Sequence, residues 1–220
     1  MQLVKSICQS LALVSVGVLG LSAAQATPTP LISPPPLTNG FQVEWARVDT
    51  APHSIADAVN ALNGSGGFTV LNRVTQTLNT IDVNDASVPF AGADPLFAVR
   101  VSGYVTLAAG RYSFSSLHDD GVRVTVGGEQ VITFDSDTGA VETDSALFDL
   151  AAGVYAYEAI SWEQGGAFNL RLGLLDAAGA GTLLVGQHAT SIPEPASLGL
   201  AGFGLLAAAG VARRARRAKV

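Results

Sequence analysis

The sequence predicts an all-β domain, an antiparallel β-sandwich or barrel with one short helix. In several segments apolar residues alternate with polar ones at a period of two, which is the pattern of half-buried strands. Glycine-containing turns separate these segments, and only one stretch has helical spacing. Many short strands with turns between them and almost no helix are typical of sandwiches and barrels.

The first 26 residues have the three parts of a secretory signal peptide. These are Lys5, the apolar run 11–21 and the small-x-small site made by Ala24 and Ala26. The run is short for a membrane span, which needs about 20 residues, and Cys8 lies before it, unlike the cysteine of a lipoprotein. We expect cleavage after Ala26. Because Cys8 is the only cysteine, the mature chain then has no disulfide and no thiolate site.

Two different segments follow the predicted cleavage site. Residues 27–40 hold five prolines and no periodic pattern, so we expect a stiff, extended linker rather than a strand. Next comes the single predicted helix, for which Ser54 is a candidate N-cap with Asp57 three residues later. Its apolar residues at helical spacing are Ile55, Ala58, Val59 and Leu62.

The predicted strands are clearest from residue 97 onward. Between residues 97 and 107 the odd positions are apolar or glycine, and the pattern resumes at Tyr112 and Phe114. The valines of residues 122–126 lead into Gly127-Gly128 and a returning apolar segment, which indicates a hairpin. Further strands are expected at residues 146–150, 154–162 and 168–174.

The C-terminus contains a second export feature. Pro193, Glu194 and Pro195 precede the apolar stretch 196–212, and a cluster of four arginines follows it. Seventeen helical residues span about 26 Å, which is marginal for a membrane, and the arginines orient the tail end inward. A plain tail anchor fits these observations equally well.

The order of these three parts resembles the PEP-CTERM sorting signal of Gram-negative bacteria that produce exopolysaccharide. The resemblance implies export across the inner membrane, a transient membrane anchor in segment 193–220, and recognition and cleavage by an exosortase. The folded domain, residues 41–190, is then delivered to the cell surface or the exopolysaccharide matrix.

Charge and motifs exclude several functions for the part between the signals. Residues 27–192 contain six basic and 17 acidic side chains, a net charge of −11. This charge repels phosphate backbones and anionic lipid, so we expect no nucleic-acid partner and membrane contact only through the signal segments. The sequence has no Gly-x-Ser-x-Gly elbow, phosphate loop or His-Glu-x-x-His helix, and we expect no enzyme.

Segments 97–105, 110–114, 118–124 and 127–132 resemble the PA14 domain, a β-sandwich module named for the anthrax protective antigen. The resemblance extends from about residue 40 to 175 and is most specific over residues 97–132. It implies a non-catalytic module that binds polysaccharide or another glycan. A structural matrix protein without a specific ligand and an accessory module of a carbohydrate-active enzyme remain the alternatives.

The aspartate pair Asp119-Asp120 is the candidate metal site. Two adjacent carboxylates repel each other unless they share a cation. In adhesins of the family the corresponding pair is joined by a cis peptide and binds calcium, which bridges two sugar hydroxyls. Calcium needs six to eight oxygens, and by resemblance Glu163 falls where the adhesins place an asparagine ligand. A polar turn without metal is the alternative.

Three residues near Glu163 are candidates for contact with a sugar ring. They are Trp162, Gln164 and Phe168. Packing in the core is the alternative for Trp162 and also for Trp45. The three histidines, His53, His118 and His188, have no metal-binding spacing and are expected at the surface or in loops.

Overall fold

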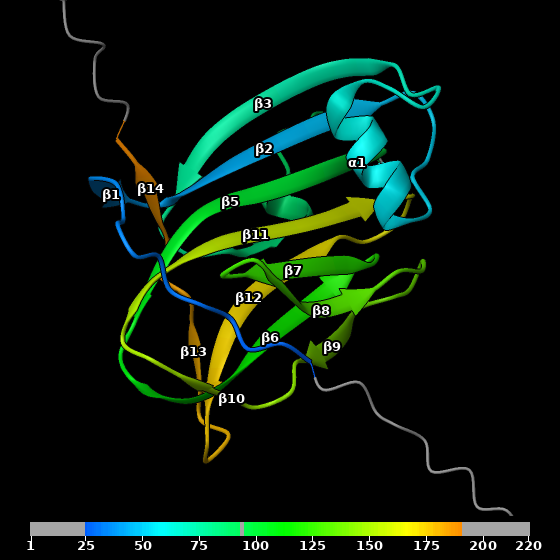
Figure 1. Ribbon diagram of the computed structural model, residues 1–220. Helices are drawn as coiled ribbons and strands as arrows, with labels where there is room; N and C mark the ends of the chain where they lie inside the picture. The colour runs from blue at the N-terminus through cyan, green and yellow to red at the C-terminus, as the bar shows by residue number, and fades with distance from the viewer. Residues whose placement is uncertain (1–24, 93–94, 191–220) are drawn as a thin grey trace, which may run out of the picture.

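The computed structural model describes residues 25–92 and 95–190, which form a β-sandwich with one α-helix (Figure 1). The first sheet contains eight strands. They are β1 (Leu37–Asn39), β2 (Phe41–Val48), β3 (Val70–Leu78), β5 (Phe97–Leu107), β7 (Val122–Val126), β8 (Glu129–Phe134), β11 (Gly153–Glu163) and β14 (Gln187–Ala189). The second sheet contains six, namely β4 (Asp82–Asn84), β6 (Gly110–Asp119), β9 (Val141–Asp144), β10 (Phe148–Leu150), β12 (Asn169–Asp176) and β13 (Gly181–Leu183).

All pairings in both sheets are antiparallel. The first sheet has the order β1-β14-β5-β11-β7-β8, with β2 joining β5 to β3. The second has the order β10-β6-β12-β13, with β4 on β12 and β9 on β6. The predicted fold class is therefore confirmed.

The alternating residues predicted to face inward form the core between the two sheets. In β5 the side chains of Phe97, Val99, Val101 and Val105 are at most 1% exposed. Leu170 and Leu172 of β12 approach them from the opposite sheet and are equally buried. Period-two patterning thus assigned the correct face to both strands.

The predicted helix is α1 (Ile55–Asn63), with the expected cap. The Oγ of Ser54 accepts a hydrogen bond from the backbone N–H of Asp57 at 3.1 Å, and Gly64 ends the helix with a φ of 62°. The helix covers one end of the first sheet (Figure 1), where its apolar face forms a second small core with Trp162. A short 3-10 turn, Asp85–Ser87, was not predicted.

The predicted hairpin is present as β7 and β8. Gly127 and Gly128 form its two-residue turn with φ values of 54° and 88°. Positive φ at both positions is the type I′ geometry, which matches the twist of the paired strands and favours glycine.

The structure of the proline-rich segment differs from the expectation, which was an extended linker without a strand. Leu37–Asn39 form β1 on β14, and the N–H of Leu31 donates to the carbonyl of Val154 at 2.8 Å. Pro28 is buried, and Thr29 packs on the turn at Gly127. The short strand was missed because proline and lack of periodicity predict extended backbone but not whether a surface is available to receive it. The division of the chain into segments stays a prediction.

Residues 1–24 of the predicted signal peptide and the tail after residue 190 lie outside the described residues. So do the processing residues Ala24, Pro193, Glu194 and Pro195, while Ala26 is exposed. The part of the chain that the structure describes contains no helix long and apolar enough to cross a membrane.

Candidate metal centre

The candidate site lies where the chain crosses from one sheet to the other. Asp119 ends β6 in the second sheet, and Asp120 and Gly121 lead into β7 in the first. The strand β11 runs beside β7 and ends at Glu163. The N–H of Asp120 donates to the carbonyl of Trp162 at 3.0 Å, which fastens the crossing to β11. Topology thus brings together residues that are more than 40 positions apart.

Gly121 is required by the close packing at this crossing. A Cβ at this position would lie 2.3 Å from Cη2 of Trp162 and 2.4 Å from the carbonyl oxygen of Phe134. No side chain fits within these distances, so the Asp-Asp-Gly sequence has a packing requirement besides any metal requirement. The peptide bond between Asp119 and Asp120 is cis, as the family resemblance implied.

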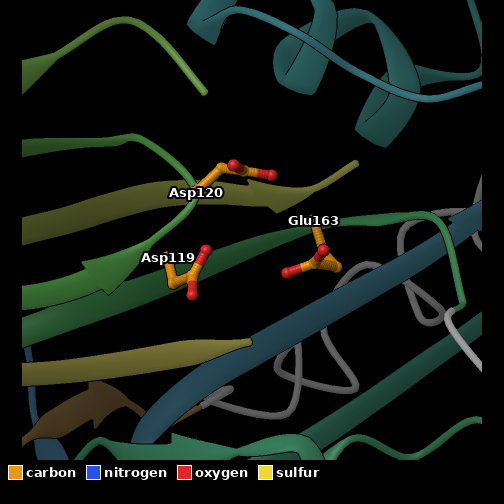
Figure 2. A group of neighbouring side chains, drawn as sticks. All are labelled: Asp119, Asp120 and Glu163. Atoms are coloured by element: carbon orange, nitrogen blue, oxygen red, sulfur yellow. The ribbon is translucent and has the colours of Figure 1, made fainter. Parts of the chain in front are cut away.

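Three carboxylates converge in this place (Figure 2). Asp119, Asp120 and Glu163 each offer an oxygen, and the three oxygens lie within 4.8 Å of one another. Two oxygens bound to one calcium ion at 2.3–2.6 Å are at most about 5 Å apart, so one ion can contact all three. The residues are 8%, 2% and 1% exposed, respectively.

Hydrogen bonds hold two of the carboxylates but leave one oxygen free. Asp120 accepts from the backbone N–H groups of Thr138 and Gln164, both at 2.9 Å. Glu163 accepts from the N–H of Gly165 at 2.7 Å through Oε1, while its buried Oε2 has no partner among the residues that the structure describes. Such an unpaired buried oxygen is costly unless a ligand binds it.

Burial without a compensating cation raises the pKa of all three acids. Burial is the largest cause for Glu163, whose pKa rises to about 8 with further contributions from Asp120 and Asp119. The pKa of Asp119 rises to about 6, through burial and then the charge of Asp120. Burial also raises the pKa of Asp120, opposed by its two backbone hydrogen bonds. Within residues 25–92 and 95–190, none of the three forms an ion pair with lysine, arginine or histidine.

His118, which precedes the aspartate pair, is fully buried, contrary to the expected position at the surface or in a loop. Its Nδ1 lies 2.6 Å from the carbonyl of Asp120 and its Nε2 2.9 Å from Oγ1 of Thr143. Because a carbonyl only accepts, Nδ1 carries the proton, and Nε2 accepts from the threonine hydroxyl. Burial lowers the pKa of His118, which favours this neutral form.

Two further acids near the group were not predicted as site residues. Asp85 accepts from the N–H of Phe168 at 2.8 Å, and its charge contributes to the raised pKa values of Asp119 and Glu163. Asp137 accepts from Nε1 of Trp162 at 3.2 Å. No spacing in the sequence links either residue to the aspartate pair, since long-range topology alone brings them near.

Of the three residues predicted to contact a sugar, two are buried and one is partly exposed. Trp162 and Phe168 are both 0% exposed, and their rings pack in the core. A ring without an exposed face cannot stack on a sugar, so we do not carry these two residues into the proposed ligand site. Gln164 is partly exposed beside the carboxylates. Trp45 is likewise fully buried, in accordance with the packing alternative.

A cavity of about 360 Å³ adjoins the carboxylate group. Glu163 and Asp85 form acidic parts of its wall, and Val88 and Phe90 form apolar parts. The loop residues Gly166 and Ala167, which follow β11 in the chain, also line the cavity and are exposed. A ligand in this cavity would therefore lie directly beside Glu163.

Comparisons with known proteins agree with this architecture. The PA14 domain model matches residues 59–192, and the PEP-CTERM protein-sorting motif matches residues 191–217. The motif indicates export and sorting to the cell envelope. A search of curated proteins finds no match.

Several solved structures share the fold. The PA14 domain of the MpAFP antifreeze protein is 20% identical with a TM-score of 0.57, covering 74% of this chain and 97% of its own. The PA14 sugar-binding domain of an RTX adhesin is 22% identical with a TM-score of 0.56, covering 69% and 99%.

The A domain of epithelial adhesin 9 from Candida glabrata, solved with Galβ1-3GlcNAc, is 13% identical. Its TM-score is 0.53, and the match covers 76% of this chain and 99% of that one. Identities this low establish the fold alone. The family model, however, covers more than half of the chain, and its segment contains the crossing, the carboxylates and the cavity. The chain therefore belongs to the PA14 domain family.

Proposed function

We propose that this domain is a non-catalytic carbohydrate-binding module that holds a calcium ion between Asp119, Asp120 and Glu163. The observation that carries the proposal is the buried group of three carboxylates without a cationic partner among the described residues. Such a group repels itself unless a cation is shared, and oxygen donors at this spacing suit calcium. Carbonyl groups of the loop after Glu163 and water supply the remaining ligands.

The ion is the contact point for a sugar. Two vicinal hydroxyls replace two of its waters, as calcium accepts a variable number of oxygens in flexible geometry. The cavity next to Glu163 receives the rest of the ring, with Phe90 as an apolar wall. Asp85 and the net charge of −11 favour a neutral glycan over an acidic one. The sugar-binding RTX adhesin domain and the glycan complex of the Candida glabrata adhesin support this class of ligand.

The carboxylates do not fit the requirements of a glycosidase. Retaining glycosidases place two carboxyl groups about 5–5.5 Å apart with the scissile bond between them. The spacing here is similar, but Asp119, Asp120 and Glu163 are at most 8% exposed. No glycosidic bond can enter between them, whereas a dehydrated ion can.

The position of the site suits a surface protein held by its C-terminal tail. Along β5, Phe97 pairs with Glu163 at the site, and Tyr104 pairs with Gln187 of β14. Seven residues of strand correspond to about 23 Å, so the chain leaves the fold at the end remote from the site (Figure 1). A tail in the membrane would leave the site facing outward, toward a cell-surface or matrix exopolysaccharide.

Thermal unfolding with and without metal tests the calcium site. The chain from residue 27 to 190 gains about 2.7 kcal/mol at a calcium concentration of 100 times Kd, if only the folded state binds. Asp119→Asn and Asp120→Asn lose most of this gain. Asp149→Asn, which alters an 87% exposed acid in another strand, keeps it. Identical wild-type melting curves in millimolar calcium and in chelator contradict the proposal.

A further inference from the structure

The sorting motif begins immediately after a residue that is fastened to the fold. Thr190 donates to the carbonyl of Pro36 through its backbone N–H at 3.0 Å and through Oγ1 at 3.1 Å. The motif starts at residue 191, and Pro193 is only three positions from Thr190. Three extended residues reach about 10–11 Å. An enzyme that binds the motif at Pro193 must therefore lie close to the folded domain.

A protease needs an extended segment on both sides of the bond that it cuts, and folded chains are cut from locally opened segments. With β14 closed, only residues 191 and 192 separate the fold from Pro193. If β14 detaches as far as Gly186, seven positions separate the fold from Pro193, a reach of about 23–25 Å.

The strand β14 is weakly attached compared with the strands around it. It has three residues, pairs with β1 over three positions and meets β5 at the single pair Gln187–Tyr104. None of its side chains is buried, and the nearest upstream contact with the core is Gly186, which packs on the ring of Phe41. Its side chains add two hydrogen bonds, from Oγ1 of Thr106 to Oε1 of Gln187 at 2.7 Å and between Nδ1 of His188 and the carbonyl of Gly40 at 2.8 Å. Since few apolar contacts hold it, β14 opens more readily than the buried strands around it.

We propose that β14 detaches from β1 and β5 before the sorting enzyme cuts the tail, so that opening of this strand is a step of processing. The inference rests on the proposed sorting of the chain. Release of β14 is the step that makes the motif accessible, and the strand returns to β1 after the tail has been removed. The rate of processing is therefore set by the stability of the pairing between β1 and β14.

A disulfide between the two strands tests the proposal. Leu37 and Ala189 are paired residues. The pairs Pro36–Thr190 and Gly40–Gly186 lie one and three positions away along the same ladder, and each is linked by a backbone hydrogen bond. By the alternation of an antiparallel ladder, Leu37 and Ala189 form a non-hydrogen-bonded pair, whose Cα spacing of about 4.5 Å suits a disulfide. The only natural cysteine is Cys8, in the predicted leader, and the exported compartment is oxidising.

The full chain carrying Leu37→Cys and Ala189→Cys is expressed in the native host, and intact mass is measured in membrane and surface fractions. We expect the tailed precursor to accumulate at least tenfold and a membrane-permeant reductant to restore processing. Each single cysteine variant is processed normally. So is the control Arg111→Cys with Asp149→Cys, an exposed pair between β10 and β6. Normal processing of the disulfide-bonded β1–β14 variant overturns the proposal.

A second variant acts in the opposite direction and does not depend on a disulfide. Thr38→Pro removes a backbone donor from β1 without altering the motif. One lost hydrogen bond changes an opening equilibrium by about fivefold, so we expect processing to be about fivefold faster. Unchanged or slower processing of this variant also overturns the proposal. If the wild-type surface protein retains residues 213–220, the sorting assignment itself fails, which the wild-type sample shows separately.

Discussion

Replacing Glu163 with glutamine should stabilise the metal-free chain and reduce the stabilisation that calcium gives. Glu163 is 1% exposed and its pKa in the folded chain is raised to about 8 from 4.5. The folded state therefore binds a proton more tightly than the unfolded state, and stability of the metal-free chain falls as pH rises from about 4.5 to 8. Glutamine has nearly the same shape but no charge, so Glu163→Gln removes this loss.

The size of the effect follows from the pKa shift. At 1.36 kcal/mol per unit, a rise of about 3.5 units corresponds to an upper limit of about 5 kcal/mol at pH 9. For a domain of this length each kcal/mol raises Tm by about 2–4 °C, so the variant should melt roughly 10–20 °C above wild type in chelator. At pH 4.5, where Glu163 is protonated in the fold, the two proteins should melt alike.

Calcium should largely remove this difference at pH 7.5 once its concentration reaches about 1,000 times Kd, where binding adds about 4.1 kcal/mol. The wild-type chain gains stability because the ion pairs with the charge that is otherwise uncompensated, whereas the glutamine variant lacks one ligand and gains less. Scanning calorimetry of residues 27–190 at pH 4.5, 7.5 and 9, in chelator and in calcium, measures all of these differences. Equal melting of the two proteins at pH 9 in chelator would contradict the burial of an uncompensated Glu163.

Three other changes have effects that the structure specifies. His118→Leu leaves the carbonyl of Asp120 and the hydroxyl of Thr143 without their hydrogen bonds, and urea unfolding should show a loss of about 2–4 kcal/mol. Gly121→Ala places a methyl group against Trp162 and should lower the free energy of unfolding in urea by about 1–3 kcal/mol. A chain that begins at Phe41 lacks β1 and the segment before it. Loss of the backbone hydrogen bonds donated by Thr29, Leu31, Gly40 and Thr190, and of those in the β1–β14 ladder, should lower its stability by at least about 3 kcal/mol relative to a chain that begins at Thr27.

The fold was largely predictable because its strongest features are local. Alternation in β5 and β12, two glycines in the β7–β8 turn and a serine cap on α1 each act within a few residues. The strands β1, β2, β3, β4, β9, β13 and β14 were not predicted. Apart from β2, in which Phe41, Val43 and Trp45 do alternate with polar residues, these strands are short or mostly exposed, so no apolar period marks them.

The candidate site was predictable only in part, for a related reason. The aspartate pair is a local motif, and Glu163 was suggested by the family resemblance rather than by spacing. The burial of Trp162 and Phe168 depends on which face α1 and the opposite sheet cover. Asp85 lies more than 30 residues before the aspartate pair and is held by a tertiary contact with Phe168. His118 is adjacent to the pair in sequence, but its second ring nitrogen contacts Thr143 of β9, 25 residues later. Sequence alone does not specify such contacts.

Glycan binding measured in calcium and in chelator shows whether the domain binds sugar through a calcium ion at the three carboxylates. Residues 27–190 are applied to an array of neutral and acidic glycans, beside the Asp120→Asn variant and the Asp149→Asn control. We expect binding to neutral glycans that is present in calcium, absent in chelator, absent in Asp120→Asn and retained in Asp149→Asn. Binding that persists in chelator, or that Asp120→Asn shows as strongly as wild type, would contradict a calcium-dependent site at these three carboxylates.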